Sequence, residues 1–277
     1  MKYEIRQCHK KEQLLWMTDG HTDLAVSLDY GIRIIHLSCA GMDNLLYEQP
    51  EDLSDGLITD KGWRIFGGHR LWAAPESDKS YYPDQDPVSY ELFENGVILT
   101  QEIDPWLNIK KQLRIEFCED GSLLLKHRIE NTSSVPCTFG SWGVTTFASD
   151  SNAEIWFDGG LEGYNPKRKI SLWGMTDLSD PRLRFTSDRI YAKQLPNSSE
   201  LKIGIFSYSG HAELTAKNQC FQMDFEADTA KTYPDDGCNF ELYTDSFVLE
   251  LEALGQLCTL EQGQAATHWE RWHVIKI

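Results

Sequence analysis

NIKKQLRIEFCEDGSLLLKHRIENTSS, residues 108–134, alternates apolar with polar side chains on both sides of an Asp-Gly pair. The alternating positions are Leu113, Ile115 and Phe117 before the pair, and Leu123, Leu125, His127 and Ile129 after it. A period of two is typical of a β-strand with one buried face, and Asp-Gly is a preferred turn between paired strands. The stretch therefore predicts an antiparallel hairpin, with His127 as a core residue.

The same pattern recurs along the chain. Hairpins are predicted in TDLAVSLDYGIRIIHLSCAG (22–41), VSYELFENGVILTQEID (88–104) and HAELTAKNQCFQMDFEAD (211–228), and further strands in FELYT (240–244), FVLELEAL (247–254) and THWERWHVIKI (267–277). No segment of ten or more residues has a convincing helical period. Many short strands joined by turns favour an all-β sandwich or barrel. No Gly/Ser-rich or Pro-rich linker divides residues 1–277, so we expect a single domain.

Composition excludes several classes of partner. The formal net charge is −17 and the pI about 4.8, which argues against binding to nucleic acid or to an anionic membrane. The sequence has no apolar run of 18 residues and no recognisable secretory signal. Seven cysteines without a CxxC pair are expected to be reduced and mostly buried in a cytoplasmic protein. GxGxxG, P-loop, GxSxG and HExxH motifs are absent, so no cofactor or metal is predicted.

The richest candidate site is FGGHRLWAAPE, residues 66–76. Its two glycines allow unusual backbone conformations or a close approach to a ligand. His69 can exchange protons near neutral pH, Arg70 carries a fork of donors, and Trp72 offers a flat apolar face beside the carboxylate of Glu76. This mixture suits a sugar-binding site. The alternative is a strand-to-loop corner whose Trp fills the core and whose Arg pairs with a carboxylate.

Other candidates lie far from this stretch in sequence. Glu241 shares a predicted strand face with Tyr243, and would be a general base if that face lines a cleft, or a solvated residue if it does not. Glu250 has the same two interpretations. The remaining candidate contacts to a ligand are Arg64, Trp142, Trp173 and Asp235, for which a surface ion pair, two core aromatics and a plain acidic turn are the alternatives.

The order of motifs resembles the galactose mutarotase (aldose 1-epimerase)-like superfamily. The resemblance runs from about Leu24 to the end through GGHRLWAAPE, FGSWGVTTF, SLWGMTDLSDPR, LKIGIFS, YPDDGCNFELYTDSFVLELEALG and THWERWHV. It implies a large antiparallel β-sandwich that binds a sugar on its concave sheet. It also implies a histidine as general acid and a glutamate as general base, for which Glu241 is the first counterpart and Glu250 the second.

The chain departs from that family at one important place. Where aldose 1-epimerases carry the acid histidine, this sequence reads TFGSWGVTTF, with Trp142 or Gly143 near the position. His69 resembles a substrate-contacting histidine of the family, so either His69 is the acid or the protein binds a sugar without epimerising it.

Three hypotheses follow for function. The first is a carbohydrate-binding protein that interconverts sugar anomers with His69 as acid and Glu241 as base. The second is a non-catalytic sugar-binding or regulatory protein that uses the same cleft. The third is a glycoside hydrolase or lyase, for which Glu76 and Glu241 would be the paired carboxylates.

Overall fold

The computed structural model describes residues 1–7, 12–49, 62–149, 151–156, 164 and 168–277. These residues form two large antiparallel sheets, and the only helical element among them is the short 3-10 turn η2 (Asp78–Tyr81). The predicted all-β fold is therefore confirmed, and of the two alternatives the chain forms a sandwich. No helix in the described part of the chain has the length and apolar character that a membrane span requires.

The first sheet has eleven strands. In spatial order they are β1 (Lys2–Gln7), β2 (Gln13–Thr18), β3 (Thr22–Ser27), β4 (Arg33–Cys39), β5 (Gly68–Ala74), β10 (Cys137–Phe147), β19 (Leu249–Leu254), β18 (Phe240–Thr244), β15 (Leu201–Ile205) and β12 (Ile170–Leu172), while β20 (Cys258–Leu260) pairs with the start of β10. The strands that carry the candidate residues are thus neighbours, although β5 and β19 are separated by about 180 positions in the sequence.

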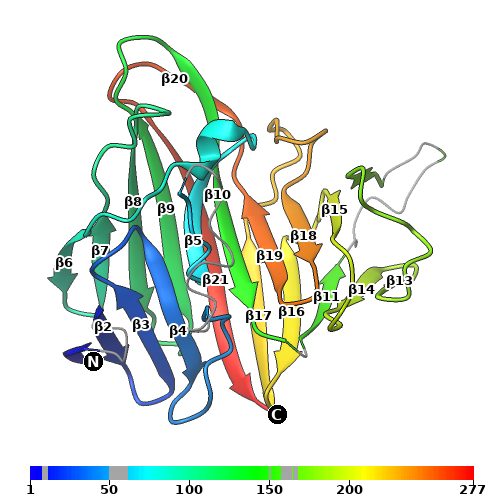
Figure 1. Ribbon diagram of the computed structural model, residues 1–277, viewed down its shortest axis with the longest axis horizontal. Helices are drawn as coiled ribbons and strands as arrows, with labels where there is room; N and C mark the ends of the chain where they lie inside the picture. The colour runs from blue at the N-terminus through cyan, green and yellow to red at the C-terminus, as the bar shows by residue number, and fades with distance from the viewer. Residues whose placement is uncertain (8–11, 50–61, 150, 157–163, 165–167) are drawn as a thin grey trace.

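The second sheet has ten strands. Their spatial order is β13 (Leu183–Phe185), β14 (Arg189–Lys193), β11 (Asn152–Trp156), β16 (His211–Ala216), β17 (Gln219–Phe225), β21 (Ala265–Lys276), β9 (Leu123–Asn131), β8 (Ile109–Phe117), β7 (Gly96–Thr100) and β6 (Ser89–Phe93). The two sheets lie one over the other in the view of Figure 1.

The four predicted hairpins are all present, as β3–β4, β6–β7, β8–β9 and β16–β17. The alternating apolar residues of segment 108–134, together with His127, are buried in the core as predicted. The main core fills the space between the sheets, where Phe147 and Phe221 meet with ring centroids 5.0 Å apart.

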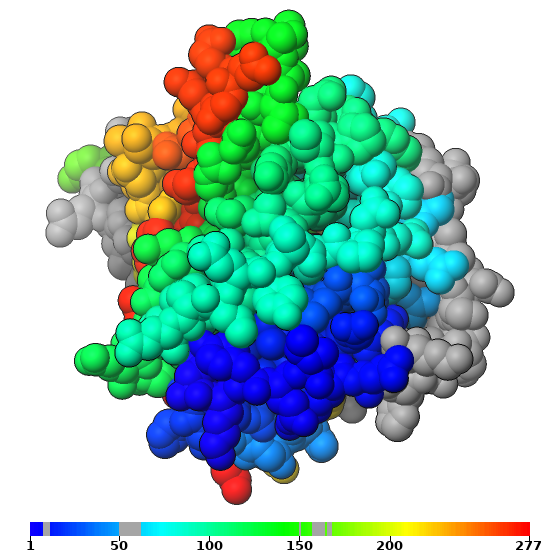
Figure 2. All heavy atoms as spheres, turned by 90° about the vertical axis from the view of Figure 1, so that its left-hand side faces the viewer, coloured from blue at the N-terminus to red at the C-terminus, as the bar shows by residue number. Residues whose placement is uncertain are grey.

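The N-terminal strands contact residues 84–93, the segment between η2 and the end of β6. The Tyr3 hydroxyl donates to the carbonyl of Phe93 at 2.9 Å. Arg33 forms a bidentate ion pair with Asp84, with N–O distances of 2.8 and 3.1 Å. Figure 2 shows this face, with the blue N-terminal segment directly beside the cyan-to-green chain that follows η2.

The cysteines partly match expectation. The six in the described residues are free thiols, but only Cys220 and Cys238 are buried and the other four are half-buried. Cys8 lies outside the described residues.

Candidate functional site

The outer face of the eleven-stranded sheet carries a cluster of charged residues that is set by strand alternation. On β18 and β19 the inward positions are apolar, namely Phe240, Leu242, Leu249 and Leu251, and the outward positions are Glu241, Tyr243, Glu250 and Glu252. Antiparallel pairing places Glu241 opposite Glu252 and Tyr243 opposite Glu250. The predicted face shared by Glu241 and Tyr243 is thus real.

Register extends this cluster across five strands. Arg70 on β5 lies opposite Val144 on β10, which lies opposite Glu252 on β19. Glu241 on β18 follows, and its partner on β15 is Gly204, two residues along the strand from Lys202 and on the same face. Side chains in such a transverse row are close neighbours. Chain segments from residue 70 to residue 252 therefore meet in one site.

The row forms one side of a groove of about 470 Å³, which is within the usual range for small-molecule sites. Aromatic rings line it: Trp72 packs against Trp142, Trp63 and Tyr81 with centroids 5.2, 5.3 and 5.2 Å away, and the half-buried Trp173 also lines the groove. Its polar lining comprises Arg70, Glu76, Glu200, Lys202, Tyr243, Asp245, Glu250 and Glu252. Flat apolar faces and charged groups thus face the same space.

Lys202 is the centre of the groove floor. Its ammonium lies 2.8 Å from Glu241 and 3.0 Å from Glu252, and it sits over the rings of Trp142 and Trp173 at 4.8 and 5.0 Å. Burial alone would lower the pKa of Lys202, but the two carboxylates raise it above its ordinary value, so the ammonium stays charged. The site therefore contains one permanent cation between two acids.

Glu241 and Glu252, the two acids beside Lys202, both have raised pKa values. Burial and the neighbouring charge of Glu252 raise the pKa of Glu241 well above its ordinary value, and Lys202 only partly offsets this. Burial also raises the pKa of Glu252, against the opposing effect of Lys202. Two adjacent carboxyl groups of this kind resist simultaneous ionisation, so one of them retains a proton at higher pH than a free carboxyl would.

A second ion pair stands beside the first. Arg70 donates to Glu250 at 3.1 Å and to Thr146 at 3.0 Å, and its guanidinium lies 4.5 Å from the centroid of Trp72. Tyr81, which also packs against Trp72, donates its hydroxyl proton to Glu76 at 2.5 Å. The alternative reading of residues 66–76 is therefore partly correct, because Arg70 does pair with a carboxylate and Trp72 is almost fully buried.

His69 is not part of this groove, and the expectation that it converges with Glu241 is wrong. Its side chain points between the sheets, where Nδ1 lies 3.0 Å from the Thr145 hydroxyl and Nε2 lies 2.9 Å from Nε2 of His127. Burial, and then the charge of Arg70, lower the pKa of His69 to about 3, so the ring is neutral. The reason is strand geometry: Arg70 faces the groove, and successive side chains on a strand alternate.

Some of the other predicted residues line the groove and some do not. Trp72, Glu76, Trp142, Trp173, Glu250 and Arg70 line the groove, and Glu241 lies directly behind Lys202. Arg64 is half-buried next to Trp63 but is not in the groove lining. Asp235, with a φ of 50°, belongs to a turn beside a different cavity of about 600 Å³, lined by Asp236, Cys238, Lys231, Tyr233 and others. Asp235 is therefore a turn residue outside the groove lining, although its charge helps to raise the pKa of Glu241.

Lys202, Tyr81, Glu200 and Asp245 line the groove without having been predicted, and so does Glu252, which shares its strand face with the predicted Glu250. Lys202 had a detectable signal, since it is the only charged residue in the apolar strand β15, where all five residues are buried. Tyr81, Glu200 and Asp245 had none, because they come from loop and strand-end positions whose placement depends on the tertiary fold.

No family model and no curated protein matches the sequence. Solved structures of very different sequence do match the fold. A provisionally assigned aldose 1-epimerase from Escherichia coli K12 superposes with a TM-score of 0.61 at 13% identity, over 96% of this chain and 100% of that one. The protein has the galactose mutarotase-like fold.

Two further structures with the galactose mutarotase-like fold agree. A galactose mutarotase-like protein from Clostridium acetobutylicum gives a TM-score of 0.59 at 9% identity, over 100% of this chain and 99% of that one. Another from Lactobacillus casei gives 0.57 at 9% identity, over 94% and 99%. The resemblance predicted from the sequence is thus confirmed at the level of fold.

Proposed function

We propose that the groove over Lys202 binds a carbohydrate. The observation that carries the proposal is the combination of aromatic walls with a floor of paired charges. Indole rings from Trp72, Trp142 and Trp173 can cover the apolar C–H faces of a sugar ring, while carboxylates accept and the guanidinium of Arg70 donates hydrogen bonds to hydroxyl groups. Proteins described as mutarotase-like have the same fold, and this supports the ligand class.

Pre-organisation favours a polar ligand here. Each charge in the floor already has a partner: Lys202 with Glu241 and Glu252, and Arg70 with Glu250. A neutral polyhydroxy ligand can add hydrogen bonds to such pairs without leaving a buried charge uncompensated, whereas an additional net charge would disturb the balance. The groove therefore suits an uncharged sugar better than a strongly charged one.

Binding is tested with a panel of neutral monosaccharides by isothermal titration calorimetry and by NMR shifts of the indole N–H groups. Trp173→Ala removes the half-buried wall and should weaken binding by about tenfold, which corresponds to about 1.4 kcal/mol. Trp156→Ala is the matched control, since Trp156 is also half-buried but belongs to β11 in the other sheet. Equal losses in the two variants, or no saturable binding by the wild type, would contradict the proposal.

A second candidate function is interconversion of sugar anomers by the Glu241–Glu252 pair, with no role for His69. Glu252 lines the groove, and Lys202 would have to move aside for Glu241 to reach a ligand. The raised pKa values of both carboxyls favour it, because one carboxyl can hold a proton while the other is ionised. The base takes the proton of the anomeric hydroxyl as the acid protonates the ring oxygen. The bond between C1 and the ring oxygen then breaks, C1 rotates, and closure on the other face returns both protons.

Exchange between anomers can be followed by saturation-transfer NMR on the same sugars. Glu241→Gln and Glu252→Gln should each abolish enzyme-catalysed exchange, whereas Glu154→Gln, on the outer face of the second sheet, should not. Binding by the wild type without accelerated exchange would leave the groove a binding site only and refute the catalytic candidate.

A further inference from the structure

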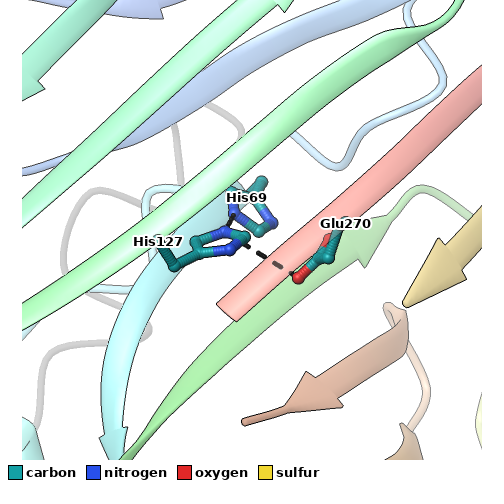
Figure 3. A group of neighbouring side chains, drawn as sticks. All are labelled: His69, His127 and Glu270. Carbon is teal, nitrogen blue, oxygen red and sulfur yellow. Dashed lines mark hydrogen bonds and ion pairs between the residues drawn. The ribbon is translucent and has the colours of Figure 1, made fainter. Parts of the chain in front are cut away.

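A second polar cluster lies inside the sandwich, away from the groove. His69 comes from β5 of the first sheet, and His127 and Glu270 come from the neighbouring strands β9 and β21 of the second. Figure 3 shows the three side chains turned toward one another. Nε2 of His69 lies 2.9 Å from Nε2 of His127, which lies 3.8 Å from Oε1 of Glu270, and one ligand atom from each residue falls within 4.8 Å of the others.

Outer contacts orient two of these groups, His69 and Glu270, inward, whereas Nδ1 of His127 has no hydrogen-bond partner. Nδ1 of His69 is bonded to the Thr145 hydroxyl at 3.0 Å, which leaves Nε2 facing the cluster. Oε2 of Glu270 accepts from the Trp272 indole at 2.8 Å, which leaves Oε1 facing the cluster. Metal-binding histidines and carboxylates are typically held from behind in this way.

The Nε2 atoms of His69 and His127 contact each other, but other polar atoms around them lack a partner. Oε1 of Glu270 and both ring nitrogens of His268 are buried and have no hydrogen-bond partner, and all of these side chains are 0–1% exposed. Gly143 on β10 adds a spatial argument, because a Cβ at that position would collide with Oε1 of Glu270. The absence of a side chain at position 143 thus leaves room for the Glu270 carboxylate. Buried polar atoms without partners are rare in native proteins and require a physical reason.

We propose that His69, His127 and Glu270 bind a divalent transition-metal ion, with zinc as the best fit. Imidazole nitrogens and a carboxylate oxygen at bond lengths near 2.0–2.2 Å are common zinc ligands, and a tetrahedral site then separates its ligand atoms by roughly 3.3 Å. The observed separations of 2.9 and 3.8 Å bracket that value. Nε2 of His268, 4.0 Å from Oε1 of Glu270, is the nearest candidate for the fourth position.

Such an ion would be structural. It would join β5 of one sheet to β9 and β21 of the other, and its charge would compensate that of Glu270 in a region from which water is excluded. Because all three ligands are fully buried, the ion must enter before the sheets close. The groove plays no part in this proposal, and sugar binding can fail while the metal site stands.

The test is to produce the full, untagged chain in minimal medium supplemented with Zn²⁺ or with Co²⁺. After dialysis against EDTA, mass spectrometry of the metal should give about one ion per chain. The Co²⁺ protein should show the visible absorption of a four-coordinate site with nitrogen and oxygen ligands. A thiolate-to-cobalt charge-transfer band would assign the metal to the cysteines, and that result, or less than about 0.1 ion per chain, overturns the proposal.

Two variants locate the site. Glu270→Gln and His127→Gln should each lose the ion, whereas His211→Gln should retain it. His211 is a suitable control because it contacts two carboxylates, Asp224 and Glu213, on the outer face of the second sheet. Retention of the ion by both cluster variants contradicts the assignment. If neither variant folds, the stoichiometry and cobalt spectrum of the wild type decide.

Discussion

His69 and Arg70 are consecutive on β5 and point to opposite faces of the eleven-stranded sheet. His69 meets His127 between the sheets at 2.9 Å, and Arg70 meets Glu250 in the groove at 3.1 Å. One strand thus supplies both the proposed sugar site and the proposed metal site. Gly68, with a φ of 72°, begins this strand so close to the carbonyl of Ile34 that a Cβ would collide with it, which helps to fix its position.

The pair between Arg70 and Glu250 should matter for stability as well as for binding. Arg70→Met leaves the nearly buried Glu250 carboxylate without its cation, and we expect a loss of about 3 kcal/mol in the free energy of unfolding. Urea unfolding measures it. Arg128→Met is the control, because its 2.7 Å pair with Glu130 is about one-third exposed and should be worth less than about 1 kcal/mol. Equal losses would show that burial adds nothing to the Arg70 pair.

The sequence predicts the strands well because most of them have one apolar and one polar face. In β8, for example, Leu113 and Ile115 are fully buried and Arg114 is not, as the period of two requires. The same signal correctly places Glu241 on the face opposite Phe240. Hairpin turns such as Asp120-Gly121 fix the local order of these strands.

The site is harder to predict because β5 has no polar face. All seven of its residues, GHRLWAA, are buried, so alternation separates His69 from Arg70 and Trp72 but does not indicate which of the two faces lines the groove. The order of the strands in the sheet is a second reason, because it brings together residues that are far apart in the sequence. Lys202 reaches Glu252 only because β18 lies between their strands, and no local pattern encodes that order.

Two histidines outside the core cluster, His36 and His211, should have pKa values that are shifted in opposite directions. Burial lowers the pKa of His36 to about 4, whereas its hydrogen bond to Asp224 raises the pKa of His211 above the usual 6.5. The stabilisation linked to neutral His36 is complete above pH 6.5 and is lost as the pH falls toward 4. That of His211 is complete below 6.5 and is lost as the pH rises through its folded pKa.

NMR titration of the imidazole C–H resonances measures both pKa values directly. His36→Gln should flatten the acid side of the stability profile between pH 4 and 6.5, and His211→Gln the side above pH 6.5, each by at most about 1.4 kcal/mol per pH unit. Identical pKa values for the two rings would contradict the environments described for them.

Asp84 should be essential to the contact between the N-terminal strands and the segment after η2. Its carboxylate is 2.8 Å from the fully buried Arg33 and 4.0 Å from Lys111. Burial would raise the pKa of Asp84, but these two cations lower it below its usual value. Asp84→Asn leaves Arg33 without its carboxylate and Lys111 with only the more distant charge of Asp104, and should cost about 3–5 kcal/mol in urea unfolding. The exposed pair of Asp120 with Arg271 provides the control, and Asp120→Asn should cost less than about 1 kcal/mol.

Gly143 tests whether the space in front of Glu270 is needed. In Gly143→Ala the new methyl carbon would lie 2.2 Å from Oε1 of Glu270 and 3.2 Å from the ring of His69, so the carboxylate or β10 must shift. Overpacking of this kind costs about 1–3 kcal/mol. Gly174→Ala is the control because nothing lies within 4 Å of a Cβ there. A displaced Glu270 would also release the Trp272 indole, whose N–H resonance should shift in the first variant only. Equal stability and an unchanged indole resonance would show that the carboxylate has room to move without cost.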